Sequence, residues 1–234
     1  MTMKTPILLA SIWLMLLMNN TYSGEESLYD FLWLDPDKSV YVLQNKTHEK
    51  KGSFYFDLGY SNVTNSKFQS SKAASFQLGY YIWEEWGIEV LYHKYKNKNN
   101  DSFESVQRVN NIEPFVRRFQ SMGGILGVWS PFYGKINTFN KIYYFDWSIA
   151  AGVGQISAEN NARTVRNPNQ LSTYDEEKIT SAIIKTELKF HINKQIHLQM
   201  EYMENHYRAP GATLPAKEKW RKQGEFVIGV GYSF

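Results

Sequence analysis

The chain has 234 residues, a formal net charge of +3, 16% aromatic residues and no cysteine. So small a charge predicts no nucleic-acid partner, and the lack of cysteine excludes both disulfides and a lipid-anchored cysteine. Beyond residue 23 no apolar run approaches the roughly 18 residues that a membrane-spanning helix needs. The mean hydropathy of −0.46 is nevertheless compatible with membrane strands, because these alternate apolar and polar residues.

Residues 1–23 have the layout of a secretory signal peptide. Lys4 precedes an apolar run from Ile7 to Met18, and small residues stand at the minus-three and minus-one positions of a cleavage site. The run is too short to span a bilayer as a helix. An amphipathic or buried helix is the alternative, but the run has no polar face. We therefore expect the mature chain to begin near Gly24.

Residues 24–52 are expected to form a periplasmic N-terminal segment ahead of the barrel. Residues 27–34 resemble a short amphipathic helix that ends before Asp35-Pro36, and residues 40–43 resemble a short strand. We expect this segment to fold against the barrel mouth or a neighbouring subunit, because a free tail would not expose so much apolar surface. A flexible tail is the alternative. The candidate contacts with a second copy in a homo-oligomer are Leu28, Phe31, Leu32, Trp33 and Leu34.

From residue 53 onward, eight segments alternate apolar and polar residues with a period of two, which predicts β-strands. One face of each segment is apolar and the other is small or polar, although the glycine-rich segment at residues 121–130 shows this least clearly. The expected strands are Ser53–Ser61, Ala74–Ile82, Trp86–Tyr95, Ser121–Ser130, Tyr143–Gln155, Thr180–Ile192, Ile196–Asn205 and Glu225–Phe234.

The connections between these strands alternate in length. Short connections are expected at 83–85 and 193–195, one of intermediate length at 131–142, and long polar loops at 62–73, 96–120, 156–179 and 206–224. Short periplasmic turns and long outer loops are typical of transmembrane barrels. The predicted fold class is therefore all-β: an eight-stranded antiparallel up-and-down transmembrane β-barrel over residues 53–234. We expect it in the bacterial outer membrane with both termini in the periplasm.

The last strand resembles the C-terminal signal by which outer-membrane barrels are recognised for insertion. It ends on an aromatic residue, and a strand at the end of a soluble chain is usually an edge that invites aggregation. A closed barrel has no such edge. The barrel-assembly machinery and outer-membrane lipid are accordingly the expected partners. The residues that carry the signal are Phe226, Ile228, Val230, Tyr232 and Phe234.

Charged side chains gather on the face of the strands that would point into the barrel. An eight-stranded lumen is just wide enough to be filled by side chains, and buried charges need partners or water. A structural ion-pair network that plugs the lumen is the favoured interpretation, and a narrow path for water, protons or small ions is the alternative. The expected members of this lumen network are Asp57, Glu89, His93, Asp146, Lys185, Glu187, Lys189 and Glu201.

No combination of residues predicts an enzyme, a metal site or a bound cofactor. His191 and His197 flank a short turn, but no third ligand follows at a convincing spacing. His93 could meet Ser148 or Ser181 in the lumen, yet no motif supports a nucleophile there.

Basic residues on the outer loops raise a further alternative. They could bind lipopolysaccharide phosphates, although solvated surface charge explains them equally well. The arginines concerned are Arg117, Arg118, Arg163, Arg166, Arg208 and Arg221.

Three stretches carry a family resemblance: residues 28–45, residues 84–89, and residues 129–137 running on to Phe145-Asp146-Trp147. They resemble the outer membrane beta-barrel domain family abundant in predatory bacteria and myxobacteria. The resemblance covers the mature chain and implies a small porin-like barrel, with relatives thought to form rings that enclose lipid. It carries over no catalytic residue.

Two functions therefore stay open. The first is a porin-like barrel with a structural or lipid-organising role, as a homo-oligomeric ring enclosing lipid. The alternative is a monomeric narrow channel or a barrel that binds a small solute or lipid. A soluble lipocalin-like binder would instead keep its apolar face inside, and the aromatic strand ends favour the membrane over it.

Overall fold

The computed structural model describes residues 48–138, 141–167, 171–212 and 217–234. All of them belong to the second of two compact units, Lys46–Phe234. The expected signal peptide at 1–23, the helix at 27–34 with its candidate oligomer contacts, and the strand at 40–43 lie outside the described residues.

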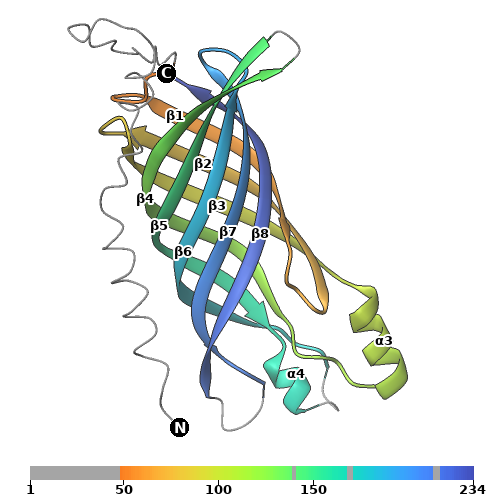
Figure 1. The fold of residues 1–234 in the computed structure, drawn as a ribbon. Coiled ribbons are helices and arrows are strands. Elements are labelled where there is room, and N and C mark those ends of the chain that lie inside the picture. The colour runs from red at the N-terminus through yellow and green to blue at the C-terminus, as the bar shows by residue number, and fades with distance from the viewer. Residues whose placement is uncertain (1–47, 139–140, 168–170, 213–216) are drawn as a thin grey trace, which may run out of the picture. The chain divides into compact units, whose positions relative to one another are not determined.

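Eight antiparallel strands form one closed barrel, which confirms the predicted fold class (Figure 1). Each strand pairs with the next along the chain, and β8 pairs with β1. The strands are β1 (Phe54–Val63), β2 (Gln69–Tyr81), β3 (Trp86–Asn99), β4 (Arg117–Thr138), β5 (Lys141–Asn160), β6 (Asp175–His191), β7 (Ile196–Pro210) and β8 (Glu218–Ser233).

The period of two places apolar side chains outside the barrel and polar ones inside. On β2, Phe76 and Leu78 are exposed while Ser75 and Gln77 are buried. This arrangement excludes the lipocalin-like alternative, in which the apolar face would point inward. Among the outward residues are Leu58, Leu78, Val90, Ile125, Val153, Ile184, Met200 and Ile228.

The strands are longer than the sequence pattern predicted. The expected turn at 131–142 is wrong, because β4 continues to Thr138 and β5 begins at Lys141, with a register shift between Trp129 and Phe132. The loops expected at 62–73, 96–120, 156–179 and 206–224 are correspondingly shortened. Backbone hydrogen bonds extend a hairpin whatever its side chains are, whereas apolar alternation marks only the part of a strand that faces lipid.

The two ends of the barrel differ (Figure 1). One end carries α3 (Asp101–Asn110) and α4 (Ala162–Arg166), neither of which was predicted, and is called the helix end. The side chain of Asn100 accepts a hydrogen bond from the Phe103 backbone at 3.1 Å and caps α3. The other, short-turn end carries the β2–β3, β4–β5 and β6–β7 connections and the C-terminus. Within the described residues, no helix is long and apolar enough to cross a membrane.

The last strand closes the barrel against the first. Tyr232 is opposite Phe56 in the β1–β8 register, and the Phe234 backbone donates to Phe54 O at 2.9 Å. The Tyr232 and Phe234 rings lie 4.9 Å apart, and both pack near Phe56. The five residues of the expected insertion signal therefore lie on the lipid-facing side of this seam.

Candidate functional site

The interior of the barrel is a packed polar network, and its central cation is Lys185 on β6. The Lys185 Nζ lies 2.6 Å from Glu89 Oε1, 2.9 Å from Glu201 Oε2 and 3.8 Å from Glu187 Oε2. It also donates to Gln77 Oε1 at 3.1 Å. All five side chains are buried. Pairing of this kind is what allows an ammonium group to stay charged away from water.

A second cluster forms around Asp57 on β1. Its two carboxylate oxygens bind Lys189 Nζ at 2.9 Å and His197 Nε2 at 2.6 Å. The Lys189 Nζ lies 3.4 Å from the centre of the Tyr55 ring. The Tyr55 hydroxyl donates to Glu89 Oε2 at 2.7 Å, so this cluster is connected to the one around Lys185.

A third cluster contains a serine, a histidine and a glutamate in sequence. Ser75 Oγ is 2.8 Å from His93 Nε2, and His93 Nδ1 is 3.3 Å from Glu225 Oε2. Tyr95 donates to the other oxygen of Glu225 at 2.7 Å, and Ser61 binds the same carboxylate. The order resembles a catalytic triad, but Ser75 is only 3% exposed and His93 is fully buried. Ser75 Oγ therefore lies in the interior of the barrel and not on its surface.

The helix end of the lumen is filled by apolar side chains. Phe119 packs edge-on against Tyr95 and Tyr207, with ring centres 5.8 Å and 5.5 Å apart. Met122 and Ile156 are also buried in this layer. An apolar layer therefore lies between the polar network and the helix end of the lumen.

The short-turn end of the lumen is closed by residues 48–53, which we call the mouth strap. Lys50 inserts its side chain and binds Asp146 Oδ1 at 2.7 Å and Ser130 Oγ at 2.8 Å. The backbone N–H groups of Lys50 and Lys51 donate to the Glu84 carboxylate in the β2–β3 turn. The strap is therefore attached both to a turn and to the inner wall.

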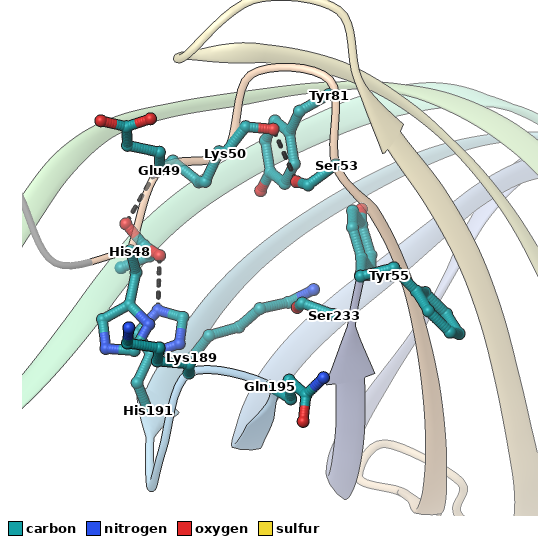
Figure 2. Close-up of a pocket in the computed structure, with 13 residues that line it drawn as sticks. His48, Glu49, Lys50, Ser53, Tyr55, Tyr81, Lys189, His191, Gln195 and Ser233 are labelled. Atoms are coloured by element: carbon teal, nitrogen blue, oxygen red, sulfur yellow. Dashed lines mark hydrogen bonds and ion pairs between the residues drawn. The ribbon is translucent and has the colours of Figure 1, made fainter.

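A pocket of about 270 Å³ remains beside the mouth strap (Figure 2). The His48 ring stacks on His191 with centres 4.1 Å apart, and His191 Nε2 is 2.8 Å from Asp146 Oδ2. Lys189 and Tyr55 line the same pocket from inside the barrel. Partial burial, together with the nearby His191 ring, lowers the pKa of His48 to about 4. His48 is therefore neutral when it stacks at neutral pH.

Across the described residues, carboxylates outnumber lysines in the buried interior. His93 and His197 each lie against one of these carboxylates. The six buried carboxylates are Asp57, Glu89, Asp146, Glu187, Glu201 and Glu225, and the three buried lysines are Lys50, Lys185 and Lys189.

A family model described as the outer membrane protein beta-barrel domain matches residues 39–234. The chain belongs to this family. The resemblance noted in the sequence is thus confirmed at the level of the family, while the link to predatory bacteria and myxobacteria stays a prediction. No curated protein matches the chain.

Solved outer-membrane barrels are similar to this one in fold. The N-terminal β-barrel domain of Pseudomonas aeruginosa OprF is 12% identical, with 79% of this chain and 98% of that chain covered and a TM-score of 0.48. Neisserial surface protein A (NspA) is 14% identical, with 79% and 100% covered and a TM-score of 0.48. Ail, the attachment invasion locus protein of Yersinia pestis, is 14% identical, with 79% and 99% covered and a TM-score of 0.46.

The outer membrane barrel gathers the expected lumen residues in four places rather than one. Glu89, Lys185, Glu187 and Glu201 meet around the central cation. Asp57 with Lys189 and His93 with Glu225 form the two neighbouring clusters, and Asp146 lies at the mouth.

Sequence reasoning missed the roles of Lys50, Tyr55, Gln77 and Glu225. The alternation does place Glu225 on the inner face of β8, but nothing in the sequence pairs Lys50 with Asp146.

The histidine and serine contacts that were expected differ in part from those in the structure. His93 contacts Ser75, not Ser148 or Ser181. Ser148 instead donates to Glu187 at 3.3 Å. His191 and His197 do meet across their turn, with ring centres 6.0 Å apart, yet each binds a different carboxylate. Among the residues that the structure describes, no three histidine, cysteine or acidic side chains are arranged to hold a metal.

The arginines of the helix end are mostly bound within the protein. Arg117 is buried and pairs with Glu177, and Arg163 is 2.9 Å from Asp175. The Arg118 guanidinium donates to Asn99 at 2.7 Å and lies 4.2 Å from the Tyr174 ring centre. The remaining three have internal partners too: Arg166 on Ala212 O, Arg208 near Glu218, and Arg221 on Ala209 O. The Arg163 and Arg208 side chains nevertheless stay more than half exposed, so lipopolysaccharide binding by this set stays a prediction.

Proposed function

We propose that this outer membrane barrel has a structural, lipid-organising role and does not conduct solutes. The observation that carries the proposal is the buried Lys185, which contacts three carboxylates from β3, β6 and β7. These side chains occupy the space through which a solute would pass. An eight-stranded barrel filled in this way forms a rigid membrane-embedded body rather than a channel.

Closure at both ends supports the same role. Lys50 in the mouth strap fills the short-turn end, and the Phe119 layer fills the helix end. A path for ions would require both to open, and would also require the central ion pairs to separate. We place both termini in the periplasm, because this puts the short turns on the periplasmic side and the longer loops outside.

Planar-bilayer recording on the purified full-length protein tests this role. We expect no steady conductance, with insertion verified by heat-modifiable gel migration of the same preparation. A steady, ion-selective current would overturn the sealed-lumen proposal and favour the alternative of a monomeric narrow channel.

Assembly into a homo-oligomeric ring enclosing lipid is a further part of the proposal. It is supported by the family resemblance and by the apolar residues Leu28, Phe31, Leu32, Trp33 and Leu34, which need a partner. Mass photometry in mild detergent should show particles larger than one protomer, and removal of residues 24–45 should shift them to monomers. A full-length protein that is monomeric in several detergents would contradict this part.

We also propose that the Ser75–His93–Glu225 array is structural and not catalytic. Its burial supports this, because a serine nucleophile must meet its substrate. A fluorophosphonate probe should leave the folded protein unlabelled. Labelling of Ser75 that disappears in His93→Gln would instead indicate a hydrolase.

A further inference from the structure

The lipid-facing band of the barrel ends at one level on β2 and β3. Phe76 and Tyr92 are register partners, both exposed and both pointing outward. Below them, toward the short-turn end, every outward residue of the two strands is apolar: Leu78 and Tyr80 on β2, and Trp86, Ile88 and Val90 on β3. Tyrosine at such a level is typical of a membrane–water interface.

Lysines occupy the same outward faces immediately beyond this level. Lys94, Lys96 and Lys98 follow Tyr92 on β3, and Lys72 on β2 is the register partner of Lys96. We call these four residues the lysine row. Outward side chains on one strand are about 7 Å apart and neighbouring strands about 5 Å, so the four ammonium groups share a small patch.

The lysine row has no internal counter-charge. Within the described part of the chain none of the four forms an ion pair, and the outward faces of β2 and β3 carry no acidic residue. Lys72 Nζ lies 5.8 Å from the centre of the Tyr60 ring. Four unpaired cations beside each other repel, and an anion placed among them removes that repulsion.

The surroundings restrict where that anion lies. A hollow of about 400 Å³ adjoins Lys94 on the β4–β6 side, but three glutamates line it: Glu159, Glu176 and Glu177. Glu177 pairs with Arg117, and Lys178 is a second lysine of the lining, so acidic side chains still outnumber lysines in the hollow. An anionic group is therefore favoured on the β2–β3 side of Lys94, above Phe76 and Tyr92, and not in the hollow.

We propose that the lysine row binds the phosphorylated headgroup of a membrane lipid whose acyl chains lie on the apolar faces of β2 and β3. The continuity of these faces supports a lipid, because chains that contact Leu78 and Val90 place their headgroup at the level of the lysines. Phosphate matches the point charges of lysine, which need no fixed donor geometry. The inference uses the membrane placement of the family and not the sealed lumen, so a conducting barrel would leave it standing.

Native mass spectrometry of the full-length protein in a non-ionic detergent tests the inference. The probe is diphosphorylated lipid A, compared with the same lipid after removal of both phosphates. Changing the row to K72Q/K94Q/K96Q/K98Q should weaken binding of the phosphorylated lipid at least about tenfold and leave the dephosphorylated lipid unaffected. The arginine version, K72R/K94R/K96R/K98R, should retain binding. Heat-modifiable migration verifies that each variant folds.

A matched control removes four exposed lysines at the short-turn end, in K51Q/K135Q/K141Q/K194Q, and should bind as the wild type does. Equal loss in this control would show that only total charge matters and would overturn the site. Equal binding of phosphorylated and dephosphorylated lipid would overturn the role of phosphate. Full competition by free inorganic phosphate at the concentration of the lipid would show that the ligand is a soluble phosphate and not a lipid.

Discussion

Lys50 and Asp146 are joined across the mouth of the barrel by a contact of 2.7 Å, although they are 96 residues apart in the chain. Asp146 holds His191 with its second oxygen at 2.8 Å, and His191 stacks on His48. The Asp146 carboxylate therefore binds Lys50 of the mouth strap directly and positions His48 through His191. Residues 48–53 therefore form part of the closed end of the barrel.

Acid should loosen the mouth strap. The pKa of His48 is lowered to about 4 in the docked strap and returns toward 6.5 on release. Docked His48 therefore binds fewer protons, so docking is fully stable above pH 6.5 and weakens as the pH falls toward 4. Hydrogen exchange at Lys50, Lys51 and Gly52, corrected for the intrinsic rate, should show protection falling between about pH 7.5 and pH 5.

Two variants control this pH experiment. His48→Gln should reduce the pH dependence, because it removes the ring whose pKa is lowered on docking. His206→Gln, which changes a histidine near Glu204 far from the strap, should behave as the wild type does. Protection that stays constant with pH in the unmodified protein would contradict the prediction.

The strands and their faces were predictable from sequence because a membrane barrel uses one simple rule. Lipid on one side and packed polar groups on the other impose a period of two, and each expected strand overlaps an observed one. The bounds were less predictable. Lys94, Lys96 and Lys98 continue β3 with no apolar alternation, because backbone pairing alone maintains the ladder there.

Contacts across the lumen were not predictable in the same way. Alternation shows that His93 and Glu225 point inward, but the tilt and stagger of eight strands decide that His93 meets Ser75 and Glu225. Lys50 was expected in the periplasmic segment. Nothing in the sequence distinguishes a lysine whose side chain enters the lumen from one that is exposed to solvent. The six arginines were candidates for phosphate binding because they fall in or near loops expected from the sequence. The four residues of the lysine row lie instead on β2 and β3.

Lys185→Met should destabilise the barrel strongly. The substitution leaves Glu89, Glu187 and Glu201 close together without their shared cation, and breaking a buried ion pair in this way costs about 3–5 kcal/mol. Urea unfolding in lipid vesicles measures the change. Bilayer recording on the same variant should remain silent, since lost stability rather than a new pore is expected.

A combined variant separates charge from packing at this position. Adding Glu89→Gln and Glu201→Gln to Lys185→Met neutralises two of the three stranded carboxylates and should recover part of the lost stability. If the triple variant is less stable than Lys185→Met alone, the cluster contributes through shape or hydrogen bonds and not through charge.

Gly231→Ala should break the Asp57 cluster. A Cβ at Gly231 would overlap both Asp57 Oδ1 and the His197 ring, so the pair at 2.6 Å must separate. Gly127 on β4 is the matched control, because a Cβ there meets nothing closer than Ala151 O at 4.0 Å. We expect a loss of about 1–3 kcal/mol for Gly231→Ala and little change for Gly127→Ala, measured by urea unfolding. Equal effects would contradict the described packing.

The free-energy cost of an arginine on the outer face should depend on its depth in the membrane. Val90→Arg places a charge in the middle of the lipid-facing band and should cost about 2–4 kcal/mol, whereas Ser70→Arg, level with Lys98, should cost about 0–1 kcal/mol. Both positions are outward and exposed. Similar costs at the two positions would show that the apolar band has been placed at the wrong height.

Deletion of Phe234 should reduce the yield of folded barrel. Its backbone donates to Phe54 O at 2.9 Å, and its ring packs with Tyr232 beside Phe56, where the last strand closes on the first. Loss of the residue removes the aromatic end of the expected insertion signal and the last hydrogen bond of the seam. The measurement is the heat-modifiable fraction in isolated outer membranes. Leu171→Ser, a change at a 90% exposed apolar residue outside the strands, controls for loss of apolar surface as such. An unchanged folded fraction after deletion of Phe234 would show that the seam and the assembly machinery do not depend on the terminal aromatic residue.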